Sequence, residues 1–234
     1  MRFPTKMVVK TSFESIRASE VGFPNLMPTQ PDRQAALEQY RRRSGVYDLE
    51  LALFEPIRRQ AIRLLAPRPG ETVIDFGCGT GLSLPQVRAA VGAAGHVVGI
   101  EQSPEMIERA RQRVASRRWR NVELICAPVE TAHWHGQADA ALFHFTHDLL
   151  QRPEAVANAL GMLRQGARVV ACGLHWAPRW ALAVNAGVYL AARRSITTLA
   201  GLDQPWRELE RQLGPMRSTT RLFSAVYIAH GQRK

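Results

Sequence analysis

The most informative segment of the 234-residue chain is Val73-Ile74-Asp75-Phe76-Gly77-Cys78-Gly79-Thr80-Gly81, which is followed by Leu82-Ser83-Leu84. An apolar run that stops at an acidic residue and then carries glycine at every second position predicts a buried strand, a tight loop and the start of a helix. Glycine permits positive φ angles and leaves no Cβ between the backbone N–H groups and a ligand. At the carboxyl end of a parallel strand, such a loop suits a cofactor that carries a nucleoside.

Two kinds of cofactor compete for this loop. A dinucleotide site requires Gly-x-Gly-x-x-Gly, but counted from Gly77 the third required glycine falls on Leu82. The segment 75–81 instead resembles motif I of the class I S-adenosylmethionine-dependent methyltransferases. The resemblance implies S-adenosyl-L-methionine as the cofactor, with five contacts in this segment: Asp75, Gly77, Cys78, Gly79 and Gly81.

The chain after Pro69 alternates predicted strands with predicted helices. The strands are expected at 72–76, 96–101, 121–126, 139–145 and 167–173, and the helices at 82–91, 104–118 and 153–163. This alternation predicts an α/β fold, with a parallel sheet covered by helices on both faces. Residues 216–223 and 224–231 alternate like an antiparallel pair. The resemblance implies a Rossmann-like, seven-stranded, mostly parallel sheet that ends in this antiparallel hairpin.

The flanking regions divide the chain into an N-terminal arm and helix, 1–45, and a methyltransferase domain, 46–234. The arm is irregular up to residue 30, and a helix is expected from an N-cap at Asp32 to residue 43. Residues 174–215 interrupt the sheet pattern with an apolar helix at 181–192 and a second helix at 205–213. In the family such an insertion covers the substrate, so its character suggests an apolar or aromatic substrate. A buried packing helix is the alternative.

Composition limits the choice of partners. The formal charge is +11 and comes almost entirely from arginine, with many arginines at helical surface spacing between 109 and 120. We interpret them as a solvated face and do not expect nucleic acid or an anionic membrane as the partner, because no RNA- or DNA-binding signature accompanies them. Cys78, Cys126 and Cys172 are interpreted as buried, reduced thiols. No secretory signal and no membrane-spanning run is found, so we expect a cytoplasmic monomer or homodimer.

Further cofactor contacts are expected downstream of the glycine loop. Glu101 ends the second predicted strand, where a carboxylate can accept both ribose hydroxyls, and Gln102 follows it. Met106 resembles the family residue that packs on adenine. The stretch at 128–130 aligns with the family position where an aspartate binds the adenine amino group, but here that position is Pro128. Adenine contacts are then expected from the backbone at Pro128 and Val129, with Glu130 as the candidate substitute for the missing side-chain acceptor.

Histidines follow the fourth predicted strand, in His144-Phe145-Thr146-His147-Asp148. In the family this loop faces the transferred methyl group and holds the amino-acid end of the cofactor, so His144 is also a cofactor candidate. Histidine is suited to proton transfer near neutral pH, and either His144 or His147 is a candidate general base. An ordinary loop or core histidine is the alternative. No metal site is expected, because no second ligand pair has structural-zinc spacing.

Four aromatic or imidazole side chains are candidate substrate contacts. Tyr47 precedes Asp48 and resembles the tyrosine that faces the cofactor in many small-molecule methyltransferases; it either contributes to catalysis and substrate binding or packs at the entry of the next helix. His147 is a second substrate candidate. His175 and Trp176, just after the fifth predicted strand, are placed to face a substrate.

The expected reaction is methyl transfer to a small metabolite, at an oxygen or nitrogen, in small-molecule biosynthesis. A sulfonium donor is already activated, so the transfer depends mainly on alignment and a base is optional. Two alternatives stay open: a methyltransferase that acts on a phospholipid headgroup or RNA, and a non-catalytic protein that only binds S-adenosylmethionine.

Overall fold

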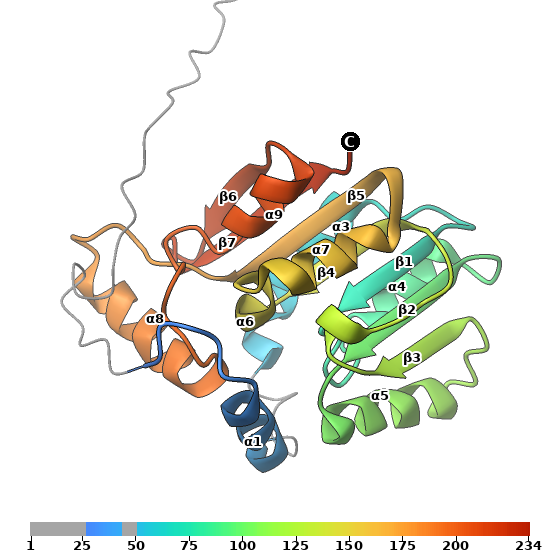
Figure 1. The fold of residues 1–234 in the computed structure, drawn as a ribbon, viewed down its shortest axis with the longest axis horizontal. Helices are drawn as coiled ribbons and strands as arrows, with labels where there is room; N and C mark the ends of the chain where they lie inside the picture. Colours follow the sequence, from blue (N-terminus) through green and yellow to red (C-terminus); the bar gives the residue numbers. More distant parts are fainter. Residues whose placement is uncertain (1–26, 44–50) are drawn as a thin grey trace, which may run out of the picture.

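The structure is a computed structural model that describes residues 27–43 and 51–234. Its described residues form a seven-stranded sheet in the order β3-β2-β1-β4-β5-β7-β6 (Figure 1). The strands are β1 (Thr72–Phe76), β2 (His96–Glu101), β3 (Val122–Cys126), β4 (Ala138–His144), β5 (Leu163–Leu174), β6 (Arg217–Arg221) and β7 (Val226–Gln232). The first five are parallel, and β7 is antiparallel to both β5 and β6. The predicted mostly parallel sheet with an antiparallel terminal hairpin is confirmed.

Helices cover both faces of this sheet. The helices among the described residues are α1 (Arg33–Arg43), α3 (Glu55–Leu65), α4 (Leu84–Val91), α5 (Pro104–Ser116), α6 (His147–Leu150), α7 (Pro153–Gly161), α8 (Leu182–Ser195) and α9 (Arg207–Leu213), with 3₁₀ turns η2 (Ala52–Phe54) and η3 (Val129–Thr131). Alternate residues of a strand point to opposite faces. Ile74 accordingly packs in a core with α7 and α9, whereas Val73 packs in a core with α3 and α4.

The segment between β5 and β6 is helical, and it has its own small core. Trp176, Tyr189 and Leu199 are among the buried residues that pack there, away from the two cores of the sheet. In Figure 1, α8 and α1 lie next to each other at the end of the molecule where the parallel strands point. Whether the chain divides at residue 45, and whether 174–215 covers a substrate, stay predictions.

Two local expectations differ from the structure. Cys126 is exposed, whereas Cys78 and Cys172 are buried. The reason is that Cys126 ends β3, the outermost parallel strand, which has a neighbour on one side only. The fifth strand begins at Leu163, not at 167, because Leu163 already pairs with Ala138 before the register shifts.

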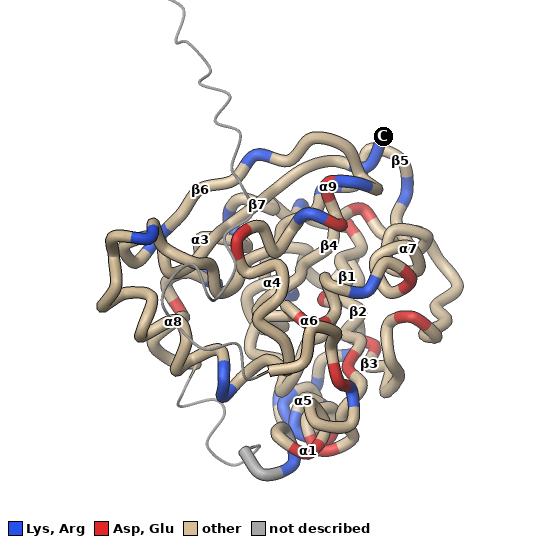
Figure 2. Tube along the Cα trace, turned by 60° about the vertical axis from the view of Figure 1, so that its left-hand side comes forward, with Lys and Arg blue, Asp and Glu red and all other residues tan. Residues whose placement is uncertain are grey.

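Charged side chains are distributed over many elements. Figure 2 shows the basic residues spread along the chain and interspersed with acidic ones. Of the arginines between 109 and 120, the ones at 111, 117, 118 and 120 are exposed. No helix in the described part of the chain has both the length and the apolar character needed to cross a membrane.

Candidate functional site

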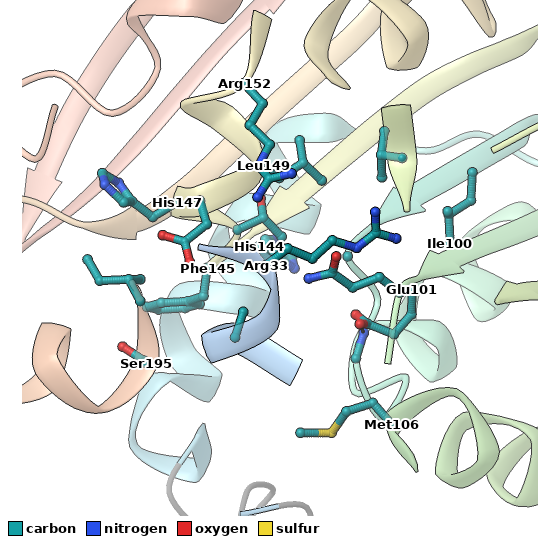
Figure 3. Close-up of a pocket in the computed structure, with 18 of the residues that line it drawn as sticks. Arg33, Ile100, Glu101, Met106, His144, Phe145, His147, Leu149, Arg152 and Ser195 are labelled. Carbon is teal, nitrogen blue, oxygen red and sulfur yellow. Dashed lines mark hydrogen bonds between the residues drawn. The ribbon is translucent and has the colours of Figure 1, made fainter. Parts of the chain in front are cut away.

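A cavity opens where β1, β2 and β4 end, beneath the first turns of α1. Together with the solvent space at its mouth, the cavity has about 800 Å³ of open volume. Residues from six segments line it: Asp32, Arg33, Ala36, Gly77, Gly79, Ile100, Glu101, Gln102, Met106, Val129, Glu130, His144, Phe145, Thr146, His147, Asp148, Leu149, Arg152, Ser195 and Ile196. Figure 3 shows Glu101 and Met106 at one end of this set and His147, Phe145 and Ser195 at the other.

The glycine loop forms the floor between these two ends. Gly77, Gly79 and Gly81 have φ angles of 70°, 55° and 78°, which L residues rarely adopt. A Cβ on Gly77 would lie 2.4 Å from Cγ2 of Thr146, so glycine is required for the close approach of the two loops. Gly81 lines neither this cavity nor the smaller cavity described below. Its lack of a Cβ leaves room for the side chain of Leu84 at the start of α4.

Glu101 is held rigidly at the end of β2. Its side chain is 6% exposed, its Oε2 accepts the N–H of Gly79 at 3.1 Å, and its Oε1 accepts the N–H of Ser103 at 2.8 Å. Burial raises the pKa of this carboxyl above its usual range, and the backbone donors oppose the effect. Each carboxylate oxygen has two acceptor positions, so the group can accept further hydrogen bonds from a ligand.

A second, smaller cavity of about 330 Å³ adjoins the first at Gly77, Gly79, His144 and Phe145. Asp75, Cys78 and Arg58 line it. Both carboxylate oxygens of Asp75 are buried, and neither has a hydrogen-bond partner among the described residues. Burial raises the pKa of Asp75 to about 7, against the opposing charge of Arg58. A buried acceptor without a donor is costly, so this site favours a ligand that supplies one.

His144 lies between the two cavities. Its Nδ1 is 2.9 Å from Oγ of Ser83, and its Nε2 is buried with no partner within residues 27–43 and 51–234. Burial, together with the positive charge of Arg58, lowers the pKa of His144 to about 3. The imidazole is therefore neutral at physiological pH, and it offers one free ring nitrogen to a ligand.

His147 and Asp148 attach the loop after β4 to the segment after α8. Nε2 of His147 donates to the carbonyl of Ala200 at 2.9 Å, and burial lowers the pKa of this histidine to about 4. Asp148 accepts the Thr197 N–H at 3.0 Å and the Thr197 hydroxyl at 2.8 Å, and Oγ1 of Thr197 in turn accepts the N–H of Asp32 at 2.8 Å. These bonds fix α1 and the end of α8 over the cavity.

The expected adenine contacts gather at the Glu101 end, with one exception. Met106 is 1% exposed and, with Gln102, Val129 and Glu130, lines the cavity, but Pro128 does not. Oε1 of Glu130 is 3.0 Å from Nη1 of Arg152. Because this ion pair engages the carboxylate, Glu130 is less suited than the backbone of η3 to bind a neutral amino group.

The other substrate candidates lie apart from the cavity or outside the described residues. Trp176 is 1% exposed in the core of the insertion. Nδ1 of His175 donates to the carbonyl of Ser224 at 3.1 Å, and its ring stacks on Trp206. His175 and Trp176 line neither cavity, so the structure does not place them with the other candidates. Their role as substrate contacts remains a prediction. Tyr47 falls outside the described residues.

Several lining residues were not singled out from the sequence. Phe145 has a φ of 56°, an outlier for a bulky residue, and its ring lies 4.9 Å from that of Phe54. Strained residues of this kind gather at functional sites. Arg33, Arg152 and Ser195 reach the cavity from elements far apart in the chain. Among the described residues, no group of three or more His, Cys, Asp or Glu is placed to hold a metal ion.

Comparison with known proteins identifies relatives of the core. Residues 73–166 match the family model described as methyltransferase domain. Aklanonic acid methyltransferase DauC of Streptomyces sp. (strain C5) is 30% identical over 141 residues, which are 58% of this chain and 64% of that protein. Nocamycin O-methyltransferase of Saccharothrix syringae is 35% identical over 79 residues, 33% of this chain and 28% of that protein. The chain therefore spans less than two thirds of either relative.

The fold also matches solved structures. The N-methyltransferase NodS of Bradyrhizobium japonicum WM9, in complex with S-adenosyl-L-homocysteine, aligns with a TM-score of 0.56 over 76% of this chain and 86% of that one. The sequences are 15% identical, so this likeness concerns the fold alone.

Proposed function

The chain belongs to the class I S-adenosylmethionine-dependent methyltransferases, and from this membership we propose that it transfers a methyl group from S-adenosyl-L-methionine to a small, apolar or aromatic metabolite. The observation that carries the proposal is the pair of buried carboxylates beside the glycine loop, Asp75 in β1 and Glu101 at the end of β2. Glu101 keeps acceptor positions for ribose hydroxyls, and Asp75 has two oxygens without a donor. These groups fit the polar ends of this cofactor.

Each end of the cofactor has a counterpart among the described residues. Glu101 would accept the ribose hydroxyls, Met106 and Val129 would pack against adenine, and Asp75 would accept the ammonium of the methionine part. The positive φ of Gly77 and Gly79 lets the backbone pass close beneath the sugar and the sulfur. When bound, the cofactor supplies a methyl group on a positively charged sulfur, which an acceptor attacks in line.

The acceptor would occupy the opposite end of the cavity. Phe145, Leu149 and Ile196 line this region, so its walls favour an apolar or aromatic body. α1 and the segment after α8 close it through Asp32 and Thr197, and excluding water helps to align the nucleophile. The aklanonic acid and nocamycin enzymes act on small metabolites by name, which supports a small acceptor here.

The test has two stages. Calorimetric titration with S-adenosyl-L-homocysteine is expected to show saturable binding by the parent protein. Incubation with methyl-labelled S-adenosylmethionine and a panel of aromatic carboxylic acids, phenols and amines is then expected to label one class of acceptor. No binding of the homocysteine product would refute the proposal. Binding without turnover on the panel would favour the non-catalytic alternative, and labelling of RNA or phospholipid vesicles would favour the macromolecular one.

A further inference from the structure

Arg58 is an unusual side chain for the position that it occupies. It lies on α3, the helix before the glycine loop, and it is 3% exposed. Arginine is almost never fully buried unless it is paired. Its one carboxylate contact among the described residues is Glu55, at Nη1, and Glu55 also accepts from Nε of Arg59 at 2.9 Å. The guanidinium is thus buried but shares its counter-ion with an exposed neighbour.

The same small cavity holds a buried carboxylate that does not pair with Arg58. Asp75 and Arg58 both line it, yet neither oxygen of Asp75 has a hydrogen-bond partner in the described part of the chain. Two opposite charges that face one cavity without bonding each other match a ligand that carries both charges itself. An α-amino acid group is such a ligand, since its ammonium and carboxylate are separated by one carbon atom.

We infer that Arg58 binds the α-carboxylate of the methionine part of the cofactor in the small cavity, opposite the ammonium held by Asp75. The inference rests on the proposed function, which places an S-adenosyl group on the glycine loop. It assigns a binding residue outside the glycine motif, on a helix that precedes the sheet. The guanidinium is suited to this role because its planar fork can bind a carboxylate through two parallel hydrogen bonds.

The experiment compares two ligands that differ only in the carboxylate. These are S-adenosyl-L-homocysteine and its decarboxylated form, S-adenosyl-3-thiopropylamine, each titrated by calorimetry into the full chain. The parent is expected to bind the homocysteine form about 10- to 100-fold more tightly, the range for a hydrogen-bonded charge pair. Arg58→Gln is expected to bind the two ligands about equally, because the substitution should lower the affinity only for the ligand that carries the carboxylate.

Arg59→Gln is the matched control. It removes the same charge from the next position of the same helix and from the same Glu55, but its side chain is 61% exposed. It should keep the preference of the parent. If Arg58→Gln does not fold, Arg58→Lys retains the buried charge without the fork and should still lower the preference.

The outcomes separate this inference from the function on which it rests. A parent that binds both ligands with equal affinity, or a folded Arg58 variant that keeps the full preference, overturns the carboxylate assignment. Equal weakening of both ligands by Arg58→Gln also overturns it, because that is the result of a purely structural role. A parent that binds neither ligand overturns the proposed function itself.

Discussion

Cofactor binding should release a proton from Asp75. The pKa of this carboxyl is about 7 in the structure, so about half of the molecules carry the proton at pH 7. An ammonium group placed against the carboxylate lowers its pKa, and the bound state is then ionised. We expect about half a proton to be released per S-adenosyl-L-homocysteine bound at pH 7. Below pH 7, the affinity should fall by up to about tenfold per pH unit.

The same group sets a pH dependence for the stability of the cofactor-free protein. Because the folded pKa of about 7 exceeds the ordinary value of 3.8, the contribution of Asp75 to stability is fully present below about pH 4 and is lost as the pH rises through about 7. The difference corresponds to about 4 kcal/mol in the free energy of unfolding at neutral pH and above. Asp75→Asn should therefore raise the melting temperature without ligand at pH 8, while it weakens ligand binding.

Calorimetry in buffers of different ionisation enthalpy measures the released protons directly. The slope of the binding enthalpy against the ionisation enthalpy of the buffer gives their number, and the difference between parent and Asp75→Asn removes the ligand's own titration. Asp203→Asn is the control, since Asp203 pairs with Arg207 at 2.7 Å outside both cavities. Equal slopes in the parent and Asp75→Asn would refute the assignment of Asp75 to the ammonium.

Three further changes test other parts of the site. Glu101→Gln should weaken S-adenosyl-L-homocysteine binding about 10- to 100-fold, because the NH₂ group of the new side chain must face one of the two backbone N–H donors. The control is Glu123→Gln, on the exposed neighbouring strand, which should leave the affinity measured by calorimetry unchanged. A Glu101→Gln variant that binds with full affinity would contradict the ribose role. Gly77→Ala and Gly70→Ala both place alanine at a positive φ, 70° and 83° respectively, which costs of order 1–3 kcal/mol. Only Gly77→Ala also brings its Cβ too close to Thr146, so urea denaturation should show a larger loss in the free energy of unfolding for this variant. Equal losses for the two variants would mean that the loop can relax. Asp148→Asn should lower the free energy of unfolding by about 1–3 kcal/mol and speed amide hydrogen exchange in the segment after α8. Unchanged exchange would show that the bonds from Thr197 to Asp148 do not hold this segment in place.

The sequence predicts the sheet well because its signals are local. The apolar run of β1, the glycines after it and the acid that ends β2 are each recognised within a stretch of a few residues, and the structure places Gly77, Gly79 and Glu101 on one cavity. The boundaries at Leu163 and the exposure of Cys126 depend on which strand lies next in the sheet. That order is a property of the whole fold, so neither could be read from a local pattern.

The acceptor end could not be predicted for the same reason. Phe145, Leu149 and Ile196 belong to the loop after β4, to α6 and to the segment after α8, and only tertiary packing brings them to one cavity. Trp176 illustrates the reverse case. Its place just after β5 is typical of a substrate contact, but the apolar side chains of the insertion bury it. An aromatic residue has the same sequence pattern in both situations.

The two histidines of the β4 loop differ in what their hydrogen bonds allow. The Ala200 carbonyl can only accept, so Nε2 of His147 must carry the ring proton, and Nδ1 keeps a lone pair that is buried without a partner. This arrangement fixes the tautomer of a neutral base. For His144 the Ser83 hydroxyl can donate or accept, so its tautomer is not fixed. It also lines the small cavity with Arg58 and Asp75, where the amino-acid part of the cofactor would lie. We therefore expect His144 to contact the cofactor, and if the reaction uses a base, His147 is the better placed of the two, because it lies at the end of the cavity opposite Glu101.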